Sequence, residues 1–178
     1  MARATMTDLI ALVRGLIGDN EPEPAFTDDE IESYLDLRRD YVLKELLTAL
    51  PAPDGSQTKW QAAHRYWEAD VALTDPAGTV LLPETSDPKS GYFTFSESQS
   101  AVYATGFTYD VYAASAELLT VWAGRIEQDI TKFSADGSSF EFAGVRDSKL
   151  KLASEYKAKS AAFGSVRSVR MIRDDFTA

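Results

Sequence analysis

The sequence has no cysteine and only one histidine, His64, in its 178 residues. The absence of cysteine excludes disulfides and thiolate metal sites, and it agrees with folding in a reducing cytoplasm. A single histidine also excludes a metal centre built on several imidazoles, which leaves carboxylate sites or one imidazole among carboxylates. We expect His64 to be structural.

Positive charge and long apolar runs are also scarce. Lysine and arginine total 18 against 28 aspartates and glutamates, a formal net charge of −10. Binding to a phosphate backbone therefore has little support from overall charge. An acidic surface suits solubility, and it equally suits a wall along which DNA slides without sticking. Because the sequence has neither an apolar run of about 18 residues nor a small-residue cleavage site near its start, we expect a soluble, unexported chain without membrane contact.

Helical periodicity is present in the first third of the chain. Apolar residues recur at helical spacing from Thr7 to Ile17, with Thr7 as the expected N-cap and Gly18 as the stop. The motif "TDDE" at 27–30 is a capping box, which predicts the start of a second helix. The apolar spacing extends this helix to about Leu50.

Helical spacing returns in the last third, from Tyr109, and predicts a long core helix followed by a last helix from about Val145 to Gly164. The stretch "FSADGSSFEFAG" at 133–144 lies between them. Its oxygen-bearing side chains do not recur at the alternate positions of a calcium loop. Its centre "ADGSS" has one glycine and no following lysine, which does not fit a phosphate-binding loop. We predict a corner with a turn at Asp136-Gly137, closed by the side chains of Phe133, Phe140 and Phe142.

The middle of the chain has strand character. Apolar residues alternate with polar ones from Trp67 to Leu73, and the later runs "YFTF" and "AVYATGFTY" are rich in β-branched and aromatic residues. We predict a mainly α fold in one domain, 1–178: a bundle of about four helices with an inserted small antiparallel β meander and an extended C-terminal tail. The helical core spans about 7–58 and 109–164, the insertion about 67–108, and the tail about 165–178.

Acidic pairs are the remaining candidates for metal chemistry. Asp28 and Asp29 fall in the first turn of a predicted helix, where carboxylates favour the macrodipole, so capping accounts for them. We predict no catalytic residue, no metal and no cofactor. The alternative is a metal-dependent enzyme that uses Asp28, Asp29 and Asp136.

The tail "SVRSVRMIRDDFTA" places an arginine at every third position, with aliphatic residues between. One interpretation is a solvated chain end. The other is an arm that orders on a carboxylate-rich partner, using arginine for charge and the aliphatic residues for apolar contact. The predicted docking residues are Arg167, Val169, Arg170, Met171, Ile172, Arg173 and Phe176.

Several segments, taken in order, resemble the head–tail connector, or adaptor, proteins of tailed bacteriophages. The opening, 9–42, has a short helix, a loop with an acidic residue and "FTDDEI" at the start of a helix. The segment 109–144 is an alanine- and leucine-rich helix with Trp-Ala near its end and a Ser-Ala-Asp-Gly corner, and 145–160 is similar to the last helix. The segments 67–84 and 104–115 are similar to family versions with a β insertion.

The resemblance implies a helical bundle without catalytic activity, in a ring of about twelve copies beneath the portal. Its implied partners are further copies of itself, the portal protein, the next neck or tail protein, and DNA that passes through without sequence-specific binding. Its implied location is the head–tail junction of the virion, after assembly in the host bacterial cytoplasm. The alternative is a tail-completion or decoration virion protein whose β meander is a binding module.

Overall fold

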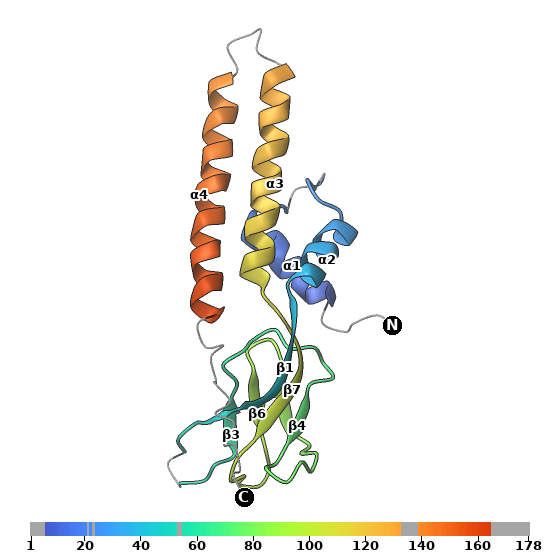
Figure 1. The fold of residues 1–178 in the computed structure, drawn as a ribbon, viewed down its shortest axis with the longest axis vertical. Coiled ribbons are helices and arrows are strands. Elements are labelled where there is room, and N and C mark those ends of the chain that lie inside the picture. The colour runs from blue at the N-terminus through green and yellow to red at the C-terminus, as the bar shows by residue number, and fades with distance from the viewer. Residues whose placement is uncertain (1–5, 21, 23, 53–54, 133–138, 165–178) are drawn as a thin grey trace, which may run out of the picture.

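The computed structural model describes residues 6–20, 22, 24–52, 55–132 and 139–164. Helices lie at both ends of this part of the chain and strands between them (Figure 1). The elements are α1 (Met6–Ile17), α2 (Asp28–Leu37), β1 (Arg39–Leu46), β2 (Thr48–Ala49), β3 (Lys59–Gln61), β4 (Ala72–Thr74), β5 (Thr85–Asp87), β6 (Tyr92–Thr94), β7 (Tyr103–Tyr109), α3 (Val111–Lys132) and α4 (Ser139–Gly164).

The fold is mixed α/β, so the prediction of a mainly α fold with one small meander is wrong. Alongside the four helices, the described strands form two antiparallel sheets, one of three strands and one of four. The largest error lies at residues 39–50, predicted as the second half of a helix. These residues form β1 and β2 instead, because β1 pairs with the distant strand β7, from Arg39 opposite Tyr109 to Leu46 opposite Tyr103. Apolar spacing along β1 fits a helix or a strand, and this non-local pairing decides between them.

The two sheets are joined at both borders. Their strand orders are β1-β7-β4 and β2-β3-β6-β5, and β1 continues through Leu47 directly into β2. At the opposite border, the Leu81 N–H donates to the Leu73 carbonyl and the Glu84 N–H to the Thr94 carbonyl, both at 2.8 Å. The sheets therefore enclose one core, and we call residues 39–109 the β unit. Its buried members are Leu47, Trp60, Ala62, Trp67, Leu73, Phe93, Phe95, Val102 and Ala104.

The predicted strands have mixed outcomes. Those over "YFTF" and "AVYATGFTY" are confirmed as β6 and β7. The strand predicted from Trp67 is reduced to β4, with Trp67 itself in an isolated bridge to Thr108. The return strand predicted over "TVLLPE" is reduced to a bridge between Val80 and Thr74. Part of the following predicted loop is a strand, β5.

The four helices form a second layer, which we call the helical unit. Figure 1 shows α3 and α4 side by side as a hairpin that points away from the β unit, with α1 and α2 against the end of α3 nearest to it. None of the helices in the described residues has both the length and the apolar composition needed to cross a membrane. The buried core is Met6, Leu9, Ile10, Val13, Ile17, Phe26, Ile31, Leu35, Tyr109, Val111, Ala114, Ala116, Leu118, Leu119, Ala153 and Tyr156.

Local signals explain most helix ends. The Thr27–Glu30 capping box is confirmed, and Gly18 follows α1 with a φ of +73°, which favours glycine. Thr7 is not an N-cap, because α1 begins one residue before it. α4 begins at Ser139, so 140–144 belong to a helix and not to the predicted corner. The Asp136-Gly137 turn lies outside the described residues.

Asp110 fixes the junction between the two units. Its Oδ1 accepts from the Ala113 N–H at 2.9 Å and caps α3, while Oδ2 accepts from the Ser160 hydroxyl of α4 at 2.6 Å. Its own N–H donates to the Arg38 carbonyl at 3.0 Å. One residue thus ties β7, both hairpin helices and the start of β1 together.

Candidate assembly interface

The carboxylates considered for a metal site have other partners where the structure describes them. Asp28 accepts two hydrogen bonds from Arg14, and Asp29 stands in the first turn of α2. Asp136 lies outside the described residues. Within the described ranges, no group of three or more histidines, aspartates or glutamates could hold a metal ion.

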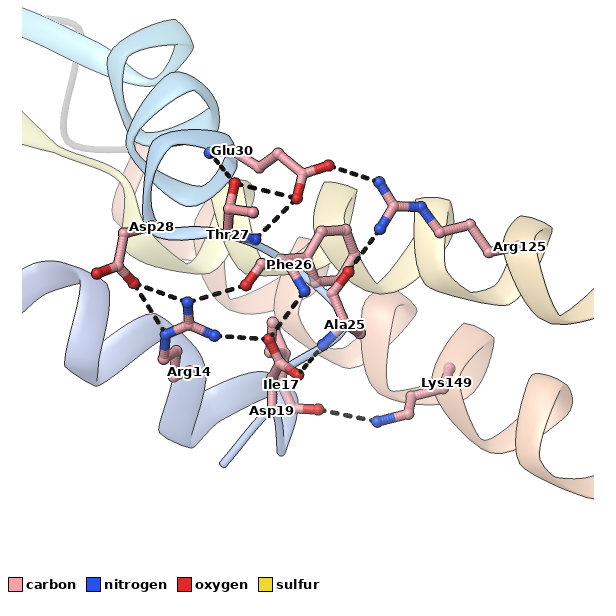
Figure 2. Close-up of polar contacts among 10 residues, drawn as sticks. All are labelled: Arg14, Ile17, Asp19, Ala25, Phe26, Thr27, Asp28, Glu30, Arg125 and Lys149. Atoms are coloured by element: carbon pink, nitrogen blue, oxygen red, sulfur yellow. Dashed lines mark hydrogen bonds and ion pairs between the residues drawn. The ribbon is translucent and has the colours of Figure 1, made fainter. Parts of the chain in front are cut away.

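A buried carboxylate organises the connection between α1 and α2. Asp19 is only 3% exposed, and it accepts from the N–H groups of Ala25 at 2.7 Å and Phe26 at 3.3 Å and from Arg14 Nη1 at 2.8 Å. Arg14 Nη2 donates in turn to the Phe26 carbonyl at 2.9 Å and to Asp28 at 2.7 Å (Figure 2). The acidic residue in this family-like loop therefore has a structural role.

An arginine of α3 holds the start of α2. Arg125 donates to the Ala25 carbonyl at 2.6 Å and to Glu30 Oε1 at 2.7 Å (Figure 2). The other Glu30 oxygen accepts from the Thr27 N–H at 2.8 Å. The Thr27 backbone hydrogen bond, followed by the contact with Arg125, lowers the pKa of Glu30 below its ordinary value.

A lysine of α4 holds the end of α1. Lys149 Nζ donates to the Ile17 carbonyl at 2.9 Å (Figure 2). It also lies 3.5 Å from the centroid of the Trp122 ring. Burial lowers the pKa of this ammonium group, and the nearby Asp19 opposes the shift. Because α1, α2, α3 and α4 all contribute to this network, it joins the N-terminal helices to the hairpin.

A second buried carboxylate stands where β1 and β7 enter the β unit. Glu68 is 6% exposed. Its two oxygens accept from Arg39 Nε and Nη2, both at 2.9 Å, and the Tyr109 hydroxyl donates to it at 2.5 Å. The Arg39 guanidinium also lies 3.5 Å from the centroid of the Phe107 ring. This pair and its ring contact fix the direction in which β1 leaves the helical unit.

His64 takes part in a structural cluster, as the sequence predicts. Its Nδ1 contacts the Glu45 carboxylate, which also accepts from the His64 N–H at 3.2 Å. The His64 carbonyl accepts from Trp67 Nε1 at 3.0 Å. The half-buried ring therefore links β1 to the chain that follows β3.

The strand β1 exposes apolar side chains beside a bulge. Tyr41, Leu43 and Leu46 are each between 57% and 66% exposed, and we call them the β1 patch. Pairing with β7 is interrupted between Val42 and Glu45, and Lys44 within the interruption has a φ of +51°, which is unusual for a residue other than glycine. The bulge removes Leu43 and Lys44 from the regular ladder and turns them toward solvent.

A second apolar surface lies at the opposite border of the same sheet. Val80 and Leu82 are exposed, Leu82 at 87%, and they belong to the segment 80–84. This segment pairs with the outer side of β4 at Val80 and Leu81 and with β6 at Glu84. Isolated exposed apolar residues are ordinary, but groups of them mark contact surfaces. The described part of the β unit thus presents two such groups, one at each border of the β1-β7-β4 sheet.

The predicted docking residues Arg167, Val169, Arg170, Met171, Ile172, Arg173 and Phe176 lie outside the described residues, so their role stays a prediction. Sequence reasoning missed the β1 patch. The run "DYVLKEL" holds tyrosine, valine and leucine between charged residues, which is also typical of a half-exposed strand. Assigning Tyr41 and Leu46 to the buried stripe of a helix concealed the fact that they face solvent.

The chain was also compared with known proteins. No protein-family model, no curated protein and no solved structure matches it.

Proposed function

We propose that the protein is a structural head–tail connector, or adaptor, of a tailed bacteriophage. In this role it forms a ring beneath the portal, extends the DNA channel and provides the surface to which the tail attaches. It belongs to the virion, at the head–tail junction, after assembly in the host cytoplasm. It performs no catalysis.

The observation that carries the proposal is the pair of exposed apolar surfaces on the β unit. Monomeric proteins rarely leave grouped apolar side chains uncovered, because covering them contributes roughly 25 cal/mol per Å² of buried area. Such surfaces suit a subunit that functions within an assembly. An enzyme, in contrast, would need a group of reactive side chains.

The resemblance to connector proteins supports a ring as the kind of assembly. The segment 9–42, which resembles the family's opening, contains the buried Asp19 network. Its residues pack the α1–α2 connection against α3 and α4, so the resembling residues have a structural role. The helix order also follows the family pattern of short helix, capped helix, core helix and last helix. The β unit between them is larger than the expected insertion.

The test is reconstitution with the portal protein of the same phage. We expect rings of about twelve copies on the portal in negative-stain images, and a matching increase in mass by light scattering. The portal must be present, because an adaptor can remain monomeric alone. A chain that stays monomeric with the portal contradicts the proposal.

A second candidate, a tail-completion or decoration protein, is favoured by one observation. The β unit has a core of its own and carries Leu82, the most exposed of the large apolar residues described. Deleting residues 75–92, which include the exposed Val80 and Leu82, would also remove β5 and the first residue of β6. The double substitution Val80→Ser with Leu82→Ser is therefore the cleaner probe. Under this candidate, the variant still forms rings on the portal but loses tail or host attachment.

A further inference from the structure

We propose that neighbouring copies of this chain meet through the β unit, with the β1 patch of one copy against the segment 80–84 of the next. This inference rests on the proposed function, because it identifies the contact that closes the ring. It commits to one occupant for both surfaces, a second copy of the same chain.

The position of the two surfaces is the first argument. In the order β1-β7-β4, β1 is the first strand, and the start of the segment 80–84 pairs with the outer side of the last, β4. A two-fold dimer uses one surface twice, whereas a ring uses two different surfaces of each subunit, in a head-to-tail contact. Two apolar surfaces at opposite borders of one sheet match the second arrangement.

The bulge is the second argument. A non-glycine residue with positive φ costs about 1 kcal/mol or more, and such strain collects at functional positions. At Lys44 the strained backbone interrupts β1 pairing, and the Lys44 N–H donates to the Thr105 hydroxyl at 3.0 Å in place of a ladder bond. The strain thus serves to present Leu43 and Lys44 outward at an edge strand.

Charge complementarity is the third argument and selects the partner. The exposed cation Lys44 follows Leu43 on the β1 side, and the exposed carboxylate Glu84 stands two residues after Leu82 on the other side. A parallel approach of the two borders can place Leu43 against Leu82 and Lys44 near Glu84. Each surface therefore carries an apolar group and a charge that the opposite surface complements.

The absence of cysteine makes the contact directly testable by disulfide trapping. A disulfide forms only where two Cβ atoms come within about 4 Å, so paired single cysteines report specific proximity. We would mix the Leu43→Cys chain with the Leu82→Cys chain under mild oxidation, with and without the portal. The matched control is Leu43→Cys with Leu150→Cys, since Leu150 is also exposed, at 42%, but lies on α4.

We expect the Leu43–Leu82 pair to form a heterodimer on the order of tenfold faster than the control pair, and each single variant alone to form little homodimer. A chain with both cysteines gives a ladder of multimers. Lys44→Glu in the Leu43→Cys chain slows trapping, and Glu84→Lys in the Leu82→Cys chain does the same. When both changes are present in the mixture, the rate of trapping is restored. Unchanged thermal unfolding shows that these exposed substitutions leave the monomer intact.

Two outcomes overturn the inference. Trapping no faster than the control while rings form on the portal removes this contact and leaves the proposed function standing. Faster trapping of Leu43→Cys with Val169→Cys than with Leu82→Cys would assign the β1 patch to the C-terminal segment of another copy. Conversely, rapid Leu43–Leu82 trapping without any portal binding supports the contact and contradicts the connector function.

Discussion

The helical unit and the β unit differ in the side chains that they expose to solvent. On the helical unit, exposed cations have partners within the same chain, as in Arg38 with Glu117 and Arg125 with Glu30. On the β unit, Leu43 and Leu82 have large apolar side chains in solvent. Among the described residues, the helical unit also exposes Leu37, Val145 and Leu150, but the β unit exposes five large apolar residues at the two borders of one sheet. The difference teaches that the β unit exposes more apolar surface that a second molecule can cover.

The largest expected effect tests whether the two units fold together. Phe93 is fully buried in the β core, so Phe93→Ala should cost about 3–5 kcal/mol. Because Asp110 bonds to both hairpin helices at the end of β7 and Tyr109 of β7 packs in the helical core, we expect one urea transition in which helical circular dichroism and tryptophan fluorescence change together. Leu118→Ala in the helical core is the matched control. Two separate transitions would mean that the β unit folds independently.

How much the sequence predicts differs between the units for a physical reason. Helix signals are local: the Thr27–Glu30 box and Gly18 act over three or four residues, and both are confirmed. β1 depends on β7, which lies far along the chain, and a strand's pairing leaves no mark in its own residues. The helical unit could therefore be predicted from periodicity, while β1 was assigned to a helix.

The same reason explains what could be predicted of the site. The role of Thr27 follows from spacing alone, but the burial of Asp19 requires Arg14 and the Phe26 backbone to meet across a loop. The β1 patch depends on a bulge, whose position is set by the partner strand. Contact surfaces thus emerge only after the sheet is assembled.

The second prediction tests the helical side of the comparison. Asp19→Ala should cost on the order of 2–3 kcal/mol, because it leaves buried N–H groups of Ala25 and Phe26 without their acceptor. Urea denaturation measures the loss. Asp28→Ala is the control, since its pair with Arg14 is exposed and should contribute at most about 1 kcal/mol. Equal losses would show that Asp19 does not organise the α1–α2 connection.

The third prediction sharpens the β side. Lys44→Gly should raise the stability of the monomer by roughly 0.5–1 kcal/mol, because glycine adopts the positive φ at this position without strain. Lys44→Ala keeps the strain and should give no gain. Thermal unfolding compares the two variants, and both should slow Leu43–Leu82 trapping because both lack the cation. Destabilisation by Lys44→Gly would mean that the bulge stores no strain.

The smallest effect concerns pH and belongs to the helical unit. The folded state lowers the pKa of Glu30 below its ordinary value of 4.5, so the ionised carboxylate stabilises the fold above that pH, and the contribution is lost as the pH falls through the lowered pKa. Glu30→Gln keeps a capping side chain but removes the charge. We expect a difference in unfolding free energy of no more than about 1 kcal/mol near neutral pH, since the pair with Arg125 is exposed and screened. The difference should shrink in acid and with added salt. A difference that stays constant well below the ordinary pKa would show that the hydrogen bonds, and not the charge, stabilise the α1–α2 connection.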